Sequence, residues 1–414
     1  MSRIDQLIKE LCPNGVPYKE LNEIGSFYSG LTGKSKEDFL NGNAKFISYM
    51  NVFGNIALNT DISESVKINE GEKQNLVQLG DILFTGSSET PNECGMSSVL
   101  TKEPSENLYL NSFCFGFRLN DKKLFLPDFS KYLFRSVFLR KQIIKTASGV
   151  TRFNVSKQKM QKVRVPVPPL PVQEEIVRIL DAFTELEAEL EAELEARKKQ
   201  YEHYMEELLT NNEFEEKTLI DMLAQPITDG PHETPKFQSS GIPFISVEAI
   251  FENKIDINKK RGFISEDYHR QCCKKYRPQK NDVFMVKSGS TTGKVAIVDI
   301  ENEFNVWSQI AAMRVNEQNS ARYLFYLLQT KSIQSQVKRM CSKGSQPNLS
   351  MRILEKFKVR VPNLEVQERI VVSLDKLFNI THSLSNGLPA EIEARRKQYE
   401  YYRDKLLTFK ELEV

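Results

Sequence analysis

Cysteine, histidine and tryptophan are scarce in this chain of 414 residues, and their placement excludes several kinds of site. There are six cysteines, four histidines and one tryptophan, and no two cysteines form a CxxC pair. The histidines make no HExxH motif, whereas a zinc site needs closely spaced soft ligands. The sequence therefore predicts no metal site.

Long apolar runs are also missing. No segment approaches the roughly 18 apolar residues that span a membrane, and the opening MSRIDQLIKELCPNG lacks the apolar core of a signal peptide. The composition, 40% hydrophobic and 27% charged, is typical of a folded globular protein. We expect a cytoplasmic protein without membrane contacts.

Catalytic motifs are missing as well. The stretches GLTGKS (30–35) and GSTTGKV (289–295) lack the glycine spacing of a phosphate-binding loop. There is no GxSxG turn, no recognisable Cys–His signature, and neither the Asn-Pro-Pro-aromatic loop nor the glycine-rich turn of an adenine methyltransferase. We therefore predict no catalytic residue and no cofactor bound by this chain.

Acidic residues are nearly absent from two segments, 129–173 and 322–360, of which only the second contains one, Glu355. The basic residues there are Lys131, Arg135, Arg140, Lys141, Lys145, Arg152, Lys157, Lys159, Lys162 and Arg164, then Arg322, Lys331, Lys338, Arg339, Lys343, Arg352, Lys356, Lys358 and Arg360. Two basic segments in an otherwise balanced chain of net charge +2 suggest two patches for a polyanion. Solvated helix faces are the alternative, and charge alone does not decide between them.

An internal repeat is the strongest positive feature. VPPLPVQEEIV (167–177) matches VPNLEVQERIV (361–371), and EARKKQYEHYMEELLT (195–210) matches EARRKQYEYYRDKLLT (393–408). A weaker match joins GDILFTGSS (80–88) to NDVFMVKSGS (281–290). We expect each half to be a globular part of roughly 150 residues followed by one long helix.

Both long helices are predicted to be amphipathic, because apolar residues recur at steps of three and four. The predicted packing residues are Ile176, Leu180, Phe183, Leu186, Leu190, Leu194 and Tyr201, then Ile370, Leu374, Leu377, Leu384, Ile392 and Tyr399. One such helix is unstable alone, so we expect an antiparallel intramolecular coiled coil related by a pseudo-two-fold axis. Packing of each helix on its own domain is the alternative. Gly387 and Pro389 should kink or break the second helix.

The globular parts are expected to be α+β and rich in strands. Short apolar runs such as AKFISYM, DILFTG, FCFGFRL, GIPFISV, DVFMVK and KVAIVDI lie between Gly, Asn and Asp turns, which is typical of strands. A basic helical segment follows in each half, FSKYLFRSVFLRKQIIK and ARYLFYLLQTKSIQSQVKRM. Polar loops rich in Ser, Thr, Asn, Gln and Lys recur in corresponding places, and such side chains bind phosphates and base edges.

Taken together, these segments resemble the specificity subunit of Type I restriction-modification systems over essentially the whole chain. The resemblance rests on LIKELCPNGVPYKELNEI, the two VPxLxVQExIV helix starts and the two EAR(K/R)KQYExY helix ends. It also rests on TDGPHETPKFQSSGIPFIS, SGSTTGKVAIV and GSQPNLS in the second half. It implies two target recognition domains, at 16–168 and 213–362, each reading half of a bipartite asymmetric DNA site. An N-terminal helix (1–15) and spacer helices at 169–212 and 363–414 complete the implied organisation.

The resemblance further implies partners and contact residues. The expected partners are double-stranded DNA, two methylation subunits that carry S-adenosylmethionine, and two restriction or motor subunits that use ATP and magnesium. The predicted DNA contacts are Thr32, Lys34, Ser87, Ser88, Thr90, Asn92, Arg152 and Asn154, then Thr228, His232, Thr234, Lys236, Lys287, Ser290, Thr291, Lys294, Ser345, Gln346 and Asn348. The first half lacks TDGPHxTP, so the two domains should read different sequences.

The tetrapeptide ELEA occurs three times in a row, at 185–196. Each copy adds about 6 Å of helix rise and roughly 40° of rotation, and 6 Å is close to two base pairs at about 3.4 Å each. We therefore expect the number of copies to set the spacing between half-sites. The alternative is that ELEA is merely a good helix former. A protein of another class, a coiled-coil interaction protein without DNA specificity, is the alternative for the whole chain.

Overall fold

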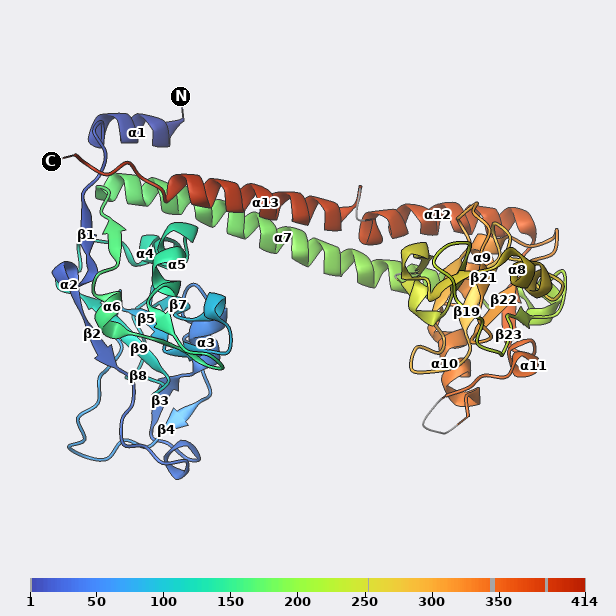
Figure 1. Cartoon of the computed structure of the whole chain (residues 1–414), viewed down its shortest axis with the longest axis horizontal. Helices are drawn as coiled ribbons and strands as arrows, with labels where there is room; N and C mark the ends of the chain where they lie inside the picture. Colours follow the sequence, from blue (N-terminus) through green and yellow to red (C-terminus); the bar gives the residue numbers. More distant parts are fainter. Residues whose placement is uncertain (1, 252, 343–346, 384–385, 414) are drawn as a thin grey trace. The chain divides into compact units, whose positions relative to one another are not determined.

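The computed structural model describes residues 2–251, 253–342, 347–383 and 386–413. The chain divides into two compact units, each with its own core (Figure 1). Unit 1 consists of Met1–Glu189 and Ile392–Val414, and unit 2 of Leu190–Glu391. Within the described residues, no helix combines the length and the apolarity needed to cross a membrane.

Unit 1 contains helices and strands in alternation. Its helices are α1 (Arg3–Leu11), α2 (Leu21–Ile24), η1 (Glu37–Phe39), α3 (Tyr49–Gly54), η2 (Pro91–Glu93), α4 (Pro127–Leu133), α5 (Val137–Ile144), α6 (Lys157–Met160), the first half of α7 (Leu170–Leu209) and most of α13 (Leu388–Leu406). Its strands are β1 (Tyr18–Glu20), β2 (Gly25–Ser29), β3 (Ala44–Ile47), β4 (Ser65–Val66), β5 (Ile82–Thr85), β6 (Ser87–Ser88), β7 (Ser97–Val99), β8 (Leu108–Leu110), β9 (Cys114–Leu119), β10 (Ala147–Ser148), β11 (Phe153–Val155) and β12 (Arg164–Pro166).

Unit 2 has a similar inventory. Its helices are the second half of α7, η3 (Leu219–Met222), η4 (Val247–Ala249), η5 (Ile257–Lys259), α8 (Glu266–Cys273), α9 (Ala321–Leu327), α10 (Lys331–Met340), α11 (Met351–Leu354) and α12 (Leu364–His382). Its strands are β13 (Glu215–Thr218), β14 (Thr228–Asp229), β15 (Ile242–Ile245), β16 (Ile250–Phe251), β17 (Lys254–Ile255), β18 (Gly262–Ile264), β19 (Val283–Val286), β20 (Val295–Ile297), β21 (Asn305–Val306), β22 (Ile310–Met313) and β23 (Lys358–Val361).

The two units contain equivalent sheets, as the sequence repeat predicts. An antiparallel sheet has the order β2-β9-β5-β7 in unit 1 and β14-β22-β19-β20 in unit 2. A second sheet with one parallel pair accompanies it, β4-β3-β8 and β18-β15-β21. Every apolar run predicted to be a strand contains one, so the prediction of α+β, strand-rich halves is confirmed.

A two-stranded ribbon connects the globular part of each unit to its long helices. In unit 2, β13 follows α7 directly and pairs with β23, which leads into α12. The chain therefore runs toward the ribbon along α7 and away from it along α12. Tyr201 of α7 packs on Phe378 and His382 of α12, with ring centroids 6.1 and 5.4 Å apart. The long helices of unit 2 are thus antiparallel.

Unit 1 closes in the same way with the two ends of the chain. The backbone of Val16, just before β1, bonds to Lys410 and Leu412, and β1 pairs with β12, which leads into α7. Phe183 of α7 stacks on Tyr402 of α13 at 5.6 Å. One turn further along α7, Glu187 pairs with Arg396, an earlier residue of α13, at 2.5 Å. The directions are again opposite, and Figure 1 shows α13 beside α7.

A buried glutamine explains the VQE motif that opens both long helices. Gln173 accepts a hydrogen bond from the backbone N–H of Leu126 and donates to the carbonyl oxygens of Leu124 and Pro168, at 2.8–3.0 Å. Gln367 accepts from the backbone N–H of Ser320 and donates to the side-chain oxygen of Asn319 and the carbonyl oxygen of Pro362. Both side chains are fully buried. Since buried polar groups need partners, these amides fix where each helix leaves its domain.

A buried Asp–Arg–Tyr cluster also occurs in each unit. Asp81, at the start of β5, accepts from Arg118 at 2.6 and 2.8 Å and from the hydroxyl of Tyr28 at 2.7 Å. In unit 2 the corresponding Asp282 accepts from Arg314 at 2.7 and 2.8 Å and from a tyrosine hydroxyl at 2.6 Å. That tyrosine, Tyr276, follows α8 instead of lying in the first strand of the sheet as Tyr28 does.

The two basic helical segments differ from the sequence expectation, whereas the second long helix agrees with it. Each basic helical segment is split in two, because Ser136 caps α5 and Thr330 caps α10 by accepting the backbone N–H three residues on. The second long helix is interrupted as predicted, since α12 ends at His382 and α13 begins at Leu388. A side chain at Gly387 would lie 2.5 Å from the carbonyl oxygen of Asn379, so the turn between them requires glycine.

The packing residues predicted for the long helices differ in burial. Ile176, Leu180, Tyr201, Ile370, Leu374 and Ile392 are buried, and Phe183, Leu186, Leu190, Leu194, Leu377 and Tyr399 are partly buried. Leu384 lies outside the described residues. The ELEA stretch is therefore only half covered, as expected of a helix with one apolar stripe.

Candidate nucleic-acid interface

Unit 1 brings four of its predicted contact residues together at one small sheet, β10-β11-β6. Asn154 lies opposite Ser87, and Phe153 lies opposite Ser88. The guanidinium of Arg152 donates to the hydroxyl of Ser87 at 3.0 Å and lies 5.9 Å from the ring centroid of Phe113. That ring is 60% exposed. A cation, amides, hydroxyls and an open aromatic face thus share one surface.

A half-buried arginine, Arg140, holds the neighbouring loop that contains Thr90 and Asn92. Thr90 donates to the carboxylate of Glu93 at 2.7 Å, while Arg140 donates to the backbone carbonyls of Asn92, Cys94 and Gly95. Burial lowers the pKa of Arg140 to about 10. Arg140 thus organises the loop and is not available to an outside ligand.

Thr32 and Lys34 lie on a different loop and have partners of their own. Thr32 exchanges two backbone hydrogen bonds with the side chain of Gln74. The ammonium of Lys34 donates to the carbonyl of Lys67 at 2.6 Å and pairs with Glu72 at 2.5 Å. This ion pair and its hydrogen bonds hold the pKa of Glu72 down at about 2. Lys34 is therefore already engaged inside the loop, and its contact with DNA stays a prediction.

Unit 2 assembles its loops at the equivalent place. Ser288 bridges to Asn348 as Ser87 bridges to Asn154. The backbone N–H of Gly289 donates to Pro347 at 2.9 Å, and that of Leu349 donates to Lys287 at 2.7 Å. The loop after β19 and the segment before α11 are thus adjacent. Predicted contacts Ser345 and Gln346 lie outside the described residues.

The remaining predicted contacts of unit 2 lie in β14 and on two loops. Thr228 lies in β14, His232, Thr234 and Lys236 are on the loop that follows β14, and Ser290, Thr291 and Lys294 are on the loop after β19. His232, Thr234, Lys236, Ser290 and Lys294 are exposed or partly exposed, and Thr228 and Thr291 are partly buried. Their role as contacts stays a prediction.

One buried carboxylate, Asp229, connects these two loops. It is 1% exposed, yet two lysines and a histidine reach it from three segments. Lys275, after α8, donates to one oxygen. Lys287 of the β19 loop lies 3.4 Å from the other, and His232 of the β14 loop lies 3.7 Å from it. Within the described residues this second oxygen accepts no hydrogen bond. Lys275 was not predicted from the sequence, because α8 carries no motif.

Several residues of the two acid-poor segments are engaged inside the protein. Lys131 lies between carboxylates of α4 and α7, and Arg322 pairs with a carboxylate of α12. Arg135 donates to four backbone carbonyls, and its burial lowers its pKa to about 10. Exposed basic residues from these segments are Lys141, Lys145, Arg152, Lys157, Lys159, Lys162, Arg164, Lys331, Lys338, Arg339, Arg352, Lys356 and Lys358, of which Arg164, Lys331 and Lys358 pair with carboxylates. Any basic patch is thus smaller than the charge count indicates.

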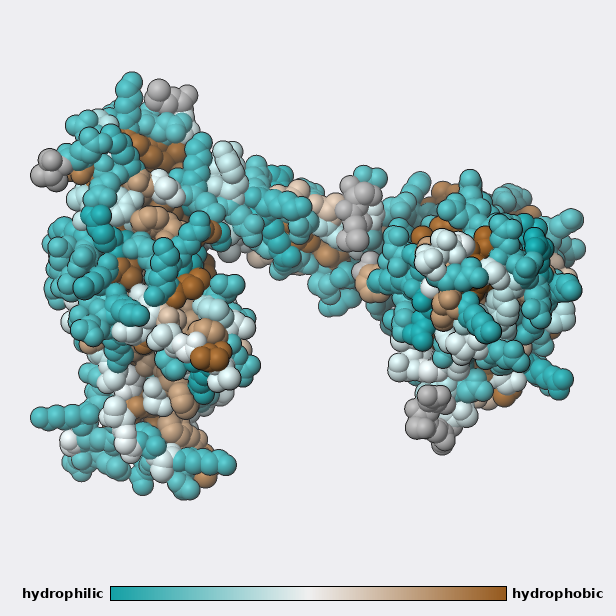
Figure 2. Space-filling model, in the orientation of Figure 1, coloured by the Kyte–Doolittle hydropathy of each residue, from teal (hydrophilic) through white to brown (hydrophobic). Residues whose placement is uncertain are grey.

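Apolar side chains also reach the surface. Leu40, Met50, Phe113 and Val150 of unit 1 are 60–91% exposed. Figure 2 shows such side chains as separate spots within a mostly hydrophilic face. Among the described residues, no group of three or more His, Cys, Asp and Glu is arranged to hold a metal ion.

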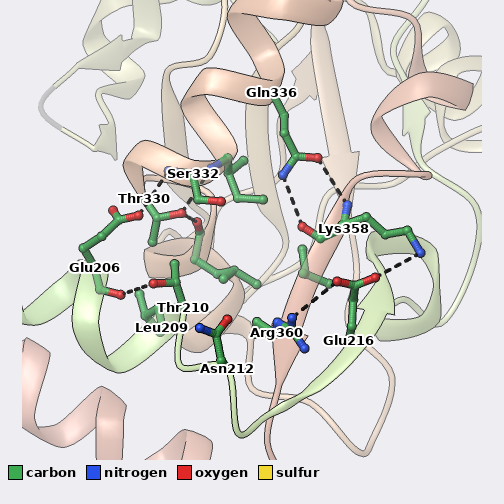
Figure 3. Close-up of a pocket in the computed structure, with 13 residues that line it drawn as sticks. Glu206, Leu209, Thr210, Asn212, Glu216, Thr330, Ser332, Gln336, Lys358 and Arg360 are labelled. Carbon is green, nitrogen blue, oxygen red and sulfur yellow. Dashed lines mark hydrogen bonds and ion pairs between the residues drawn. The ribbon is translucent and has the colours of Figure 1, made fainter.

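A cavity of about 390 Å³ lies in unit 2 where α7, the β13–β23 ribbon and α10 meet (Figure 3). Its polar groups are largely paired with one another. The carboxylate of Glu206 accepts the backbone N–H groups of Lys331 and Ser332 at 2.7 and 3.2 Å. Gln336 bonds to the backbone of Lys358, while Glu216 pairs with Lys358 and Arg360. The paired groups that line this cavity hold the end of α7 against α10 and the ribbon, so we do not regard the cavity as a candidate ligand site.

Comparison with known proteins identifies a family. The profile of the Type I restriction modification DNA specificity domain matches residues 13–196 and 212–394. The specificity subunit of the Escherichia coli type I restriction enzyme EcoR124I/EcoR124II is 34% identical over 269 residues, covering 62% of this chain and 65% of that protein. The match thus spans just under two thirds of that relative.

Two solved structures share the fold. The HsdS subunit from Thermoanaerobacter tengcongensis matches with a TM-score of 0.57 and 16% identity, over 96% of each chain. A chain from a structural study of complex assembly and conformational transition in the type I R-M system matches with a TM-score of 0.66 and 14% identity, over 95% of this chain and 98% of that one.

Proposed function

Because the chain belongs to the family of Type I restriction-modification DNA specificity proteins, we propose that it selects the DNA sequence on which such a complex acts. Residues 16–168 and 213–362 are the two target recognition domains, and 169–212 and 363–414 are the spacer helices. Residues 1–15 are the N-terminal segment, which contains the helix α1 (Arg3–Leu11). The observation that carries the proposal is the equivalent pairing of Ser87 with Asn154 and of Ser288 with Asn348, which assembles a polar loop cluster in each unit.

The two clusters differ in chemistry, and this supports an asymmetric site. Unit 1 presents Arg152 beside the ring of Phe113. Unit 2 presents His232 and Lys287 around a buried carboxylate. Rigidly held amides and cations of these kinds discriminate bases in the major groove. Each domain therefore reads a different half-site.

The chemistry of methylation and cleavage belongs to partners. Two methylation subunits, which carry S-adenosylmethionine, dock on the spacer helices, and two restriction or motor subunits use ATP and magnesium. The complex works in the cytoplasm, where the host DNA is.

Mapping methylated adenines in host DNA, with this chain present and with it deleted, tests the proposal. We expect methylation at one split motif, which disappears on deletion. An unchanged methylation map, with the methylation subunit shown to be expressed, would refute the proposal. Affinity for duplex DNA that does not fall as salt rises would favour an interaction protein without DNA specificity.

The ELEA repeats provide a second test. Removing Glu189–Ala192 shortens α7 by about 6 Å and rotates the downstream part of the helix by roughly 40°. We expect the same two half-sites to be methylated at a spacing changed by about two base pairs, at roughly 3.4 Å each. Replacing these residues with four other helix-forming residues is the matched control, and should leave the spacing unchanged. Unaltered spacing in the deletion variant would refute the length rule.

A further inference from the structure

Unit 2 carries a row of cations stacked on aromatic rings that lies outside the predicted contact loops. Three consecutive basic residues at the end of η5 each lie over a different ring. The pairs are Lys259 on Phe251 at 3.6 Å, Lys260 on Phe263 at 4.8 Å, and Arg261 on Trp307 at 5.5 Å from the ring centroids. We call these six residues the basic ridge.

The rings come from three separate elements, so the ridge exists only in the folded unit. Phe251 is in β16, Phe263 is in β18, and Trp307 follows β21. The sheet order β18-β15-β21 brings the last two to the same sheet. The face of an aromatic ring attracts a cation, so each ring restricts the basic side chain above it.

The charge of the ridge is only partly neutralised. Arg261 lies 3.5 Å from Glu248, and Lys259 lies 4.0 Å from Asp256. Both acids are at the surface, where ion pairs are weak. In the described parts of the chain, no carboxylate lies within ion-pair distance of Lys260. The ridge therefore retains positive charge at the surface.

The ridge adjoins the loop that β14 opens. The backbone N–H of Ser308 donates to the carbonyl of Pro231 at 3.2 Å. Gly230 lies so close to β21 that an added side chain would meet the carbonyl oxygen of Val306 at 1.7 Å. Trp307, whose ring lies under Arg261, is therefore next to the loop that contains His232.

We propose that the basic ridge is a phosphate-binding surface that holds the DNA backbone beside the half-site read by unit 2. The proposal rests on the proposed function and adds a contact area to it. Phosphate contacts position a protein without reading sequence, and cations already held by rings lose little freedom on binding. The ridge thus contributes affinity and no discrimination.

The test uses the complex with its methylation subunits and two duplexes, one with the motif found by methylation mapping and one with the motif scrambled. Association constants are measured from about 50 to about 300 mM salt for the wild type and for the double variant Lys259→Ala/Lys260→Ala. The measured quantity is the salt slope, the steepness with which the logarithm of the association constant falls as the logarithm of the salt concentration rises. Each lost phosphate contact lowers the salt slope by about 0.9. We expect the slope of the double variant to fall by about one to two for both duplexes, with the ratio of their affinities unchanged.

The double variant Lys274→Ala/Lys280→Ala is the matched control, because it removes the same charge from exposed positions of the same unit. Its slope should equal that of the wild type. Phe251→Leu keeps every charge and removes one ring, so we expect the wild-type slope with about two- to fivefold weaker binding to both duplexes. Melting temperatures confirm that each variant is folded.

The outcomes separate this inference from the proposed function. A wild-type slope in Lys259→Ala/Lys260→Ala, an equal fall in the control, or a loss confined to the motif duplex would each overturn the ridge. Wild-type affinity in Phe251→Leu would overturn the role of the ring. A wild-type complex without salt-dependent DNA affinity would instead refute the proposed function.

Discussion

Replacing Asp229 with asparagine should weaken sequence discrimination without weakening DNA binding in general. The substitution keeps the shape of the side chain and removes the charge that faces Lys275, Lys287 and His232. Without the attraction of the Asp229 carboxylate, the side chains of Lys287 and His232 are no longer held in one position. Because both are predicted contacts, the half-site read by unit 2 should be read less well.

The magnitude follows from burial and distance. At 3.4 Å and an effective dielectric constant of about 20, the attraction between Asp229 and Lys287 is roughly 5 kcal/mol before desolvation. Lys275 and His232 are more than half exposed and can turn to solvent, whereas the side chain of Lys287 is 12% exposed. We therefore expect the free energy of unfolding to fall by about 2–3 kcal/mol, below the range for a fully buried pair.

The assay compares the affinities of the complex for three duplexes, with the full motif, with one half-site scrambled, and with the other scrambled. One good base contact discriminates by about 1–3 kcal/mol. In Asp229→Asn we expect discrimination to fall about tenfold at one half-site, equivalent to about 1.4 kcal/mol, and to stay unchanged at the other. Affinity for scrambled DNA should not fall, because the substitution removes a negative charge.

Asp282→Asn is the matched control. Asp282 is also 1% exposed and accepts hydrogen bonds from Arg314 and Tyr276, yet among the described residues it contacts none of the predicted DNA contacts. It should lose comparable stability and keep its discrimination below its melting temperature. Equal loss of discrimination in Asp229→Asn and Asp282→Asn, or none in Asp229→Asn, would refute the positioning role.

Three further predictions concern stability and titration. Gln367→Leu leaves three partly buried hydrogen-bond partners unsatisfied, so the free energy of unfolding should fall by about 2–4 kcal/mol; a change in the denaturation midpoint worth under about 1 kcal/mol would contradict this. Burial raises the pKa of Cys114 to about 12, so at mildly alkaline pH the native thiol should resist iodoacetamide and react only after unfolding, as mass spectrometry of the peptides would show. Lys34 is the strongest of the partners that hold the pKa of Glu72 at about 2, so the pair stabilises the fold above pH 4.5 and loses this effect as pH falls toward 2. In Lys34→Ala, NMR titration should find the Glu72 pKa raised but still below its ordinary value of 4.5, because the hydrogen bonds from Asn69 and Gln74 remain; an unshifted value would contradict the pairing.

Local patterns were enough to predict the architecture. The period of apolar residues and the Gly387–Pro389 break are properties of short stretches, so the helices and the interruption follow from them. The split of the basic helical segments was missed because one capping residue, Ser136 or Thr330, outweighs a continuous apolar pattern. The repeat itself predicted two similar units.

Which side chains face an outside ligand was decided by tertiary structure alone. Arg140 and Arg152 contribute the same charge to the sequence, but in the fold Arg140 is half-buried and bonded to backbone carbonyls, whereas Arg152 lies at the surface. The Asp229 cluster and the basic ridge join residues tens of positions apart, and no local period records such pairing. The long helices, the repeat and the lack of catalytic motifs were therefore determined by sequence, since each depends on neighbouring residues. The composition of each loop cluster was decided by strand pairing, because only folding brings distant segments together.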